Sequence, residues 1–122
     1  NCSLVCTSGQ LKVAALKLFE MLDRKVRIFY SGDFDPEGLQ IADKLLGRFP
    51  NVTPWGFSEK LYFKALSSEP ISDVRLSKLD SLADSRLKQL GKSIKDHKLA
   101  GYQENILDFY REDIVKKIRE NK

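Results

Sequence analysis

A short apolar run followed at once by acidic residues and a proline constrains this chain most strongly. Val26–Ser31 (VRIFYS) is rich in β-branched and aromatic residues, which favours a strand. The chain then reads GDFDPEG, and Pro36 opens a helical pattern that extends to Phe49. Its apolar residues on one face are Leu39, Ala42, Leu45 and Leu46. The segment therefore predicts a strand, a tight acidic loop and a helix, with Pro50 ending the helix.

The same alternation extends to both sides of this segment. Ser3–Thr7 (SLVCT) reads as a short buried strand and Gln10–Arg24 as a helix. Val52–Trp55 reads as a further strand, although Pro54 cannot donate a ladder hydrogen bond. Strands that alternate with helices are typical of a parallel sheet with crossover helices. We therefore predict an α/β fold, with a Rossmann-like parallel sheet flanked by helices over residues 1–57.

The second half of the chain, residues 58–122, shows no convincing strand. Helices are predicted over Glu59–Leu66, Leu82–Lys95 and Gln103–Glu120, with a turn at Glu69–Asp73. The apolar stripe of the last helix consists of Leu107, Tyr110, Ile114 and Ile118. We expect a single domain over residues 1–122, in which a mainly helical extension follows the α/β core. Because the first residue is Asn1 rather than Met, we expect a C-terminal fragment of a longer protein.

Composition excludes several classes of protein. No apolar run reaches the roughly 18 residues that a membrane span needs, and no signal peptide is visible. In an extended strand Cys2 and Cys6 lie too far apart for a disulfide, and we expect Cys6 in the core. No cysteine stands near His97, the single histidine, which argues against a zinc site. Free thiols fit a reducing cytoplasm, so we expect a cytoplasmic protein.

Asp33 and Asp35 stand two residues apart after the predicted strand, so their side chains share a face of extended backbone. Two carboxylates with no basic residue between them repel each other unless water or a cation neutralises them. Mg²⁺ prefers one or two protein carboxylates together with waters and substrate phosphates. In parallel sheets, ligands bind beyond the carboxyl ends of the strands, where this loop lies. The pair therefore suits metal-assisted phosphodiester chemistry.

Part of this loop has a second interpretation. Asp35-Pro36-Glu37 is also typical of a helix start, with Asp as N-cap, Pro in the first turn and Glu facing the helix dipole. Asp35 and Glu37 are thus each explained without function. Asp33 lies before the cap and lacks that explanation, and Gly32 beside it allows another group to approach closely. The functional interpretation therefore depends most on Asp33.

Two further segments are candidates for phosphate contacts, each with an alternative. Ser8-Gly9-Gln10 could offer backbone N–H groups to a phosphate, or form a plain turn between strand and helix. The chain has 21 Lys and Arg against 17 Asp and Glu, a net charge of +4, and its densest basic stretch is Arg86–Lys98. Lys88, Lys92 and Lys95 fall on one face of the predicted helix, and together with Arg86 they are the candidate nucleic-acid-binding residues. The alternative is an ordinary solvated helix face.

Several of these motifs together resemble a known family. LVCTSGQ, IFYSGDFDPEGLQIADKL and PWGF resemble the Toprim-like C-terminal domain of the Wadjet-type plasmid-defence nuclease subunit and its uncharacterised bacterial relatives. That group is similar in turn to the Toprim domain of type IIB topoisomerase A subunits. The resemblance covers residues 3–57 well, and AGYQENILDFYREDI resembles the group's closing acidic helix. It implies a Toprim fold and cleavage of nucleic acid, with DNA as partner and Mg²⁺ or Mn²⁺ as cofactor.

The resemblance also implies roles for single residues. Asp33 and Asp35 would be catalytic metal ligands, and Glu104 would complete the metal shell unless it is simply an acid in the first turn of a helix. Gly32 and Gly38 would shape the corner. The remaining residues expected to line the site are Ser8, Gly9, Gln10 and Glu37.

One position of the family has no counterpart here. The Toprim glutamate that acts as general acid and base, or as a metal ligand, belongs on a strand before SLVCT, where only Asn1 and Cys2 stand. We therefore expect the first strand to be missing and this chain alone to cleave weakly or not at all, even if the parent protein is a nuclease. A missing strand would expose a sheet edge, so a homodimer and partner subunits of a defence or DNA-processing complex are also expected.

Two other functional classes remain open. A non-catalytic DNA-binding or assembly module on the same fold predicts salt-sensitive binding through the basic helix face. A haloacid-dehalogenase-like phosphatase also carries two aspartates, two residues apart, after a strand. That motif has Thr or Val two residues after the second aspartate, where this chain has Glu37, which argues against it.

Overall fold

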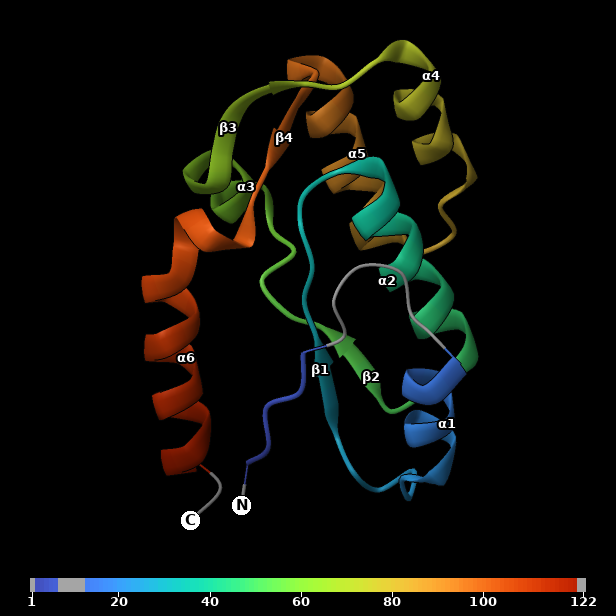
Figure 1. Ribbon diagram of the computed structural model, residues 1–122, viewed down its shortest axis with the longest axis vertical. Coiled ribbons are helices and arrows are strands. Elements are labelled where there is room, and N and C mark those ends of the chain that lie inside the picture. The colour runs from blue at the N-terminus through green and yellow to red at the C-terminus, as the bar shows by residue number, and fades with distance from the viewer. Residues whose placement is uncertain (1, 7–12, 121–122) are drawn as a thin grey trace.

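Helices and short strands alternate along the chain, as the ribbon in Figure 1 shows. The computed structural model describes residues 2–6 and 13–120. In chain order, with η for a 3-10 helix, the elements are α1 (Val13–Met21), β1 (Ile28–Tyr30), α2 (Pro36–Arg48), β2 (Val52–Pro54), α3 (Glu59–Ala65), β3 (Leu66–Pro70), α4 (Asp73–Leu76), η1 (Ser77–Ser81), α5 (Ser85–His97), β4 (Leu99–Gly101), η2 (Gln103–Ile106) and α6 (Leu107–Glu120).

β1 and β2 form the parallel pair that the alternation predicts. Their register aligns Ile28 with Val52 and Tyr30 with Pro54, and the crossover between them is α2. Pro54 is tolerated because it stands at the end of β2, and the next residue, Trp55, donates its N–H to the carbonyl of Tyr30 at 2.7 Å. The α/β class and this parallel pairing are confirmed, although each strand is only three residues long.

The prediction that residues 58–122 contain no strand is wrong. β3 and β4 pair antiparallel in a second two-stranded sheet, and the predicted turn at Glu69–Asp73 falls partly within β3. Their sequences, LSSEP and LAG, lack the β-branched residues and the alternation that reveal a strand. A backbone bridge between Phe34 and Gly101 joins this sheet to the loop that follows β1, with N–H···O distances of 2.8 and 2.9 Å.

α2 begins and ends close to the predicted bounds because its start is well capped. The Asp35 side chain accepts a hydrogen bond from the Gly38 N–H, and Pro36 stands in the first turn. The apolar face of α2 buries Leu39, Ala42 and Leu45. Its polar face contacts the second half of the chain, because the carboxylate of Asp43 accepts hydrogen bonds from the backbone N–H groups of Ala83 and Asp84.

The larger core cluster extends from Phe34 to Tyr110 and so contains residues from both halves of the chain. Phe34, Tyr62, Leu87 and Ile94 are fully buried in it. A smaller cluster of Leu45, Phe49 and Val52 lies between α2 and β2. The acidic loop therefore connects to the main core through the side chain of Phe34.

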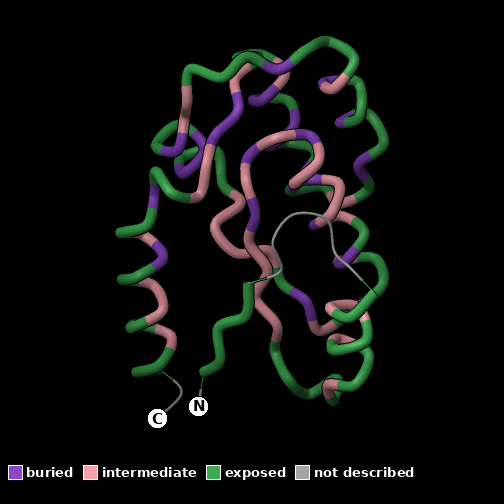
Figure 2. The backbone as a smooth tube through the Cα atoms, in the orientation of Figure 1, coloured by how far each residue is buried: buried purple, intermediate pink, exposed green. Residues whose placement is uncertain are grey.

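The N-terminal segment differs from its prediction. Residues 3–6 form no strand and are exposed, as Figure 2 shows, and Cys6 is exposed rather than part of the core. Both cysteines are free, as expected. The described part of the predicted Gln10–Arg24 helix is α1, which ends at Met21, three residues before the predicted end. α1 has no buried residue, and Met21 is 82% exposed. Thr7 and Gln10–Lys12 lie outside the described residues. Because residues 3–6 pair with no other strand, the strand that SLVCT predicts is absent over them.

The C-terminal segment also divides differently. The predicted Gln103–Glu120 helix is η2 followed by α6, and of the predicted apolar stripe of α6 only Tyr110 is buried. Leu107 and Ile118 are exposed, so this stripe is not a core face. Figure 1 shows α6 across the β1–β2 pair from α1 and α2. Among the described helices, none is long and apolar enough to cross a bilayer.

Candidate functional site

The acidic corner, which we define as Gly32, Asp33, Asp35, Glu37 and Gly38, follows the carboxyl end of β1 and enters α2. The chain folds tightly here because Gly38 has no side chain. A Cβ at position 38 would lie 2.2 Å from the carbonyl oxygen of Asp33 and 3.1 Å from Asp35 Oδ1. Gly38 thereby lets the loop lie against the first turn of α2. This brings the backbone of Asp33 and the carboxylate of Asp35 to the same turn of the helix.

Asp33 has a structural role that its sequence context does not reveal. Its Oδ1 accepts a hydrogen bond of 2.8 Å from the backbone N–H of Gln103, the first residue of η2. Asp33 thus caps an element 70 residues away in the sequence, so it too is explained in part without function. Within the described part of the chain, its second oxygen, Oδ2, makes no hydrogen bond.

Asp35 combines its cap with an unusual electrostatic environment. Oδ1 accepts from the Gly38 N–H at 2.7 Å, while Oδ2 lies 3.9 Å from the guanidinium of Arg75. Burial raises the pKa of Asp35 above its usual value, and the negative charges of Glu37 and Asp33 act in the same direction. The Gly38 hydrogen bond and the charge of Arg75 oppose this rise. A cation that contacts Oδ2 would therefore relieve an unfavourable concentration of negative charge.

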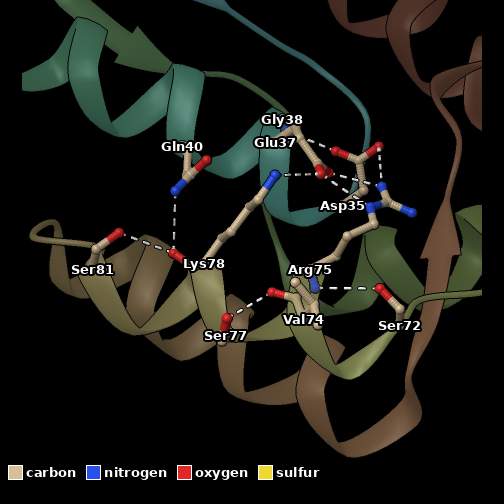
Figure 3. A network of polar contacts seen from close by, with 10 residues as sticks. All are labelled: Asp35, Glu37, Gly38, Gln40, Ser72, Val74, Arg75, Ser77, Lys78 and Ser81. Atoms are coloured by element: carbon tan, nitrogen blue, oxygen red, sulfur yellow. Dashed lines mark hydrogen bonds and ion pairs between the residues drawn. The ribbon is translucent and has the colours of Figure 1, made fainter.

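Glu37 is more than a first-turn acid, because two basic residues from the second half of the chain bind it (Figure 3). Arg75 donates from Nε to Oε1 at 3.0 Å and from Nη2 to Oε2 at 2.8 Å, and Lys78 Nζ lies 3.2 Å from Oε1. The hydrogen bonds from Arg75 lower the pKa of Glu37 to about 2. Nothing in the sequence pattern indicates Arg75 or Lys78, since each stands about 40 residues from Glu37 in the chain.

Tyr30 lies near enough to both aspartates for their charges to act on its phenol. Burial raises its pKa to about 12, and the negative charges of Asp33 and Asp35 both contribute. The ring of Tyr30 also approaches Gly32, because a Cβ there would lie 3.5 Å from the tyrosine hydroxyl oxygen. The hydroxyl therefore stays protonated beside the acidic corner at ordinary pH.

The donor set of the acidic corner fits Mg²⁺. Asp33 and Asp35 each use Oδ1 for a backbone N–H and keep Oδ2 without a hydrogen bond among the described residues. One or two carboxylates, completed by waters and phosphate oxygens, is the coordination that Mg²⁺ usually has in proteins. The described residues hold no group of three or more His, Cys, Asp or Glu that could hold a metal. Glu104 is exposed and is not brought into such a group with the two aspartates, so its role as a third ligand stays a prediction.

One comparison with known proteins gives a match. A family model described as "Protein of unknown function C-terminus (DUF2399)" matches residues 1–114. The chain belongs to the DUF2399 family. No curated protein and no solved structure matches it. The family description assigns no activity, so any function of this DUF2399 domain must be argued from its own residues.

The other predicted site residues of the DUF2399 domain are Ser8, Gly9 and Gln10 and the basic residues of α5. Ser8, Gly9 and Gln10 fall outside the described residues, so their place relative to the acidic corner stays a prediction. The basic residues lie on α5 as expected, and none of them belongs to its buried residues, which include Leu87, Leu90 and Ile94.

The basic side chains of α5 are not equally available for a ligand. Arg86 binds the helix N-cap Asp84, with Nη2 3.0 Å from Oδ2, and Lys95 is bonded to Asp80. Lys88 and Lys92 are exposed and make no ion pair with another residue of the described part. They are therefore the strongest nucleic-acid candidates on this helix.

A hollow of about 310 Å³ lies at the carboxyl end of β2 in the DUF2399 domain. Gly56 forms part of it in the left-handed region, with φ of 77°, where a side chain would be strained. Phe57 lines the hollow, and its ring also lies 3.6 Å from the Cβ position of Gly32 in the acidic corner. The other lining residues are Pro54, Ser58, Leu61, Arg86, Leu87 and Phe109.

Proposed function

We propose that this domain is the Toprim-like part of a protein that cleaves nucleic-acid phosphodiester bonds with Mg²⁺ or Mn²⁺. The observation that carries the proposal is the pair Asp33 and Asp35 at the carboxyl end of a parallel strand, each with one carboxylate oxygen that makes no hydrogen bond in the described part. The sequence resemblance to Toprim domains supports it independently.

In this proposal Asp33 and Asp35 hold the metal through their Oδ2 atoms. When bound, the ion would polarise a phosphate oxygen and lower the pKa of an attacking water. The backbone N–H groups of Gln103 and Gly38 fix the two carboxylates through their Oδ1 atoms, so the ligands are oriented before any ion arrives. Tyr30, whose hydroxyl lies beside Gly32, stays a neutral phenol and adds no negative charge there.

We assign no described residue as the general base. The resemblance implies a glutamate on a strand before the segment SLVCT for that role, so cleavage is tested on the full-length protein. DNA as substrate, a homodimer and partner subunits of a defence or DNA-processing complex belong to the same proposal.

Metal binding is the direct test on this domain. In isothermal titration calorimetry with Mn²⁺, we expect Asp33→Ala and Asp35→Ala each to weaken binding by about tenfold or more. Asp80→Ala is the matched control, since Asp80 is an exposed acid that contacts Lys95 on another element. In the parent protein, Asp33→Ala should abolish metal-dependent nicking of plasmid DNA. If the wild-type domain and the parent protein bind neither Mg²⁺ nor Mn²⁺, the proposal fails.

A second candidate function is a non-catalytic nucleic-acid-binding or assembly module, favoured by the exposed Lys88 and Lys92 on α5. It predicts DNA binding that weakens steeply with salt and is indifferent to EDTA and to Asp33→Ala. A double Lys88→Ala, Lys92→Ala variant should lose most of that binding. Binding that requires a divalent metal and Asp33 would instead favour the cleavage proposal.

A further inference from the structure

Arg75 reaches the acidic corner from α4, in the half of the chain that carries none of the corner's three acidic residues. One edge of its guanidinium donates two hydrogen bonds to the carboxylate of Glu37, at 3.0 and 2.8 Å. Figure 3 shows the guanidinium beside the carboxylates of Glu37 and Asp35, and its Nη2 lies 3.9 Å from Asp35 Oδ2. A guanidinium has five N–H donors in a fixed plane, and these two bonds use two of them. Its Nη1 makes no hydrogen bond with any described residue.

Charge neutralisation of Glu37 does not account for both basic residues. Glu37 carries one negative charge and has two cationic partners, Arg75 and Lys78, so either one would neutralise it. The side chain of Arg75 is 38% exposed, which lets an external ligand reach it. An ion pair with this exposure contributes little to stability.

The net charge of the corner and its two basic partners changes sign when a divalent ion binds. Asp33, Asp35 and Glu37 contribute three negative charges, and Arg75 and Lys78 contribute two positive ones, which leaves −1. A divalent ion turns this into +1, which matches a singly charged phosphodiester. Without Arg75 the same loaded corner would be neutral. Arg75 therefore decides whether the loaded corner attracts a phosphate.

We propose that Arg75 is a phosphate-binding residue of the acidic corner, and that Glu37 positions it. The free N–H groups of Arg75 donate to a nonbridging oxygen of the phosphate that approaches Asp33 and Asp35, a pairing for which the planar guanidinium is well suited. The inference rests on the proposed function, because it takes the ligand to be a nucleic-acid phosphate beside a bound metal. Arg75 forms and breaks no covalent bond.

The test measures binding, so it does not depend on turnover. The probe is a fluorescein-labelled DNA hairpin with a single-stranded tail, and its anisotropy is followed in Ca²⁺ over a range of salt concentrations. We expect Arg75→Ala to weaken binding about tenfold or more and to lower the slope of log affinity against log salt by about one. Arg75→Lys should keep the slope and recover only part of the affinity.

Two further variants serve as controls. One tests whether the position of Arg75 matters at constant charge, and the other tests whether loss of any positive charge weakens hairpin binding. Glu37→Asp keeps the charge but shortens the side chain, so it should weaken hairpin binding with no change in salt slope. Arg48→Ala removes the same charge from the far end of α2, where Arg48 contacts Glu20, and should change hairpin affinity less than threefold. Circular dichroism confirms that each variant is folded. If Arg75→Ala unfolds, Arg75→Lys and Glu37→Asp carry the test.

The outcomes distinguish this inference from the function on which it rests. Wild type and Arg75→Ala should bind Mn²⁺ with similar affinity, or the variant more tightly, because a cation near Asp35 has been removed. If wild type binds Mn²⁺ and Arg75→Ala binds the hairpin as Arg48→Ala does, the role of Arg75 is refuted and the metal site stands. If Arg75→Ala loses Mn²⁺ binding as well, Arg75 is a structural residue. If wild type does not bind Mn²⁺, the proposed function itself fails.

Discussion

Substitution of Gly38 by alanine tests how the acidic corner is built. The added Cβ would lie 2.2 Å from the carbonyl oxygen of Asp33, and real Cβ atoms essentially never approach another atom within 3.0 Å. The contact is with backbone, so no side-chain rotation relieves it. The loop must move away from α2 by about 0.8 Å, the difference between these two distances.

Three contributions determine how far Gly38→Ala lowers the free energy of unfolding. Overpacking of this kind costs about 1–3 kcal/mol, and weakening of the Asp35 cap costs about 0.5–2 kcal/mol. Alanine in a helix recovers up to about 1 kcal/mol relative to glycine. We therefore expect Gly38→Ala to lower the free energy of unfolding by about 2–3 kcal/mol, and to weaken Mn²⁺ binding because Asp33 and Asp35 separate.

The assay is urea denaturation followed by the fluorescence of Trp55, the single tryptophan. Its ring lies 4.8 Å from that of Tyr110, and its N–H donates to Asp113 at 2.7 Å, so unfolding exposes it. Gly47→Ala is the matched control on the same helix, because a Cβ there meets nothing within 4 Å. That variant should gain about 0.5–1 kcal/mol. Equal effects of the two substitutions would refute the close approach of Asp33 to α2.

Three further predictions concern contacts of the site and its supports. As the pH falls from 4.5 towards 2, the wild type should lose at most about 1 kcal/mol of stability relative to Arg75→Ala. The pairing with Arg75 lowers the pKa of Glu37 to about 2, so its contribution is present above pH 4.5 and is lost as the pH falls through about 2; parallel acid-unfolding curves would contradict this. In an alkaline absorbance titration, Tyr30→Phe should remove one tyrosine that ionises near pH 12, and the stability that this phenol contributes should be present below pH 10 and lost as the pH rises to 12. Asp43→Ala should lower the free energy of unfolding by about 1–2 kcal/mol in the same urea assay, because two backbone N–H groups at the start of α5 lose their acceptor; an unchanged midpoint would show that water replaces it.

The sequence predicts the acidic corner well where the signal is local. A run of apolar residues, an Asp-Pro-Glu helix start and a glycine stand next to one another, and the structure has β1, the Asp35 cap and α2 in that order. These features depend on residues within a few positions of each other. Backbone conformation and hydrogen-bonding capacity of the residues themselves determine them.

The parts that the sequence did not predict depend on distant partners. β3 and β4 are strands because they pair with each other and, at Gly101, with Phe34; their own residues have low strand propensity. Arg75 meets Glu37 only after α4 folds against α2, and Asp33 meets Gln103 only after β4 has crossed to the loop. The predicted apolar stripe of α6 is a different case. Helical spacing places its residues on one face of the helix, but spacing does not show that another element covers that face.

The bridge between Phe34 and Gly101 links any ligand of the corner to the folding of the whole domain. Phe34 stands between Asp33 and Asp35, its side chain is fully buried in the main core, and its backbone is paired with β4. Opening of the corner would break this backbone pairing and expose the side chain of Phe34. A ligand that binds only the folded state at one hundred times its dissociation constant should raise the free energy of unfolding by about 2.7 kcal/mol. Thermal-shift screening of metals and oligonucleotides would thus detect ligands of this corner without any assay of activity.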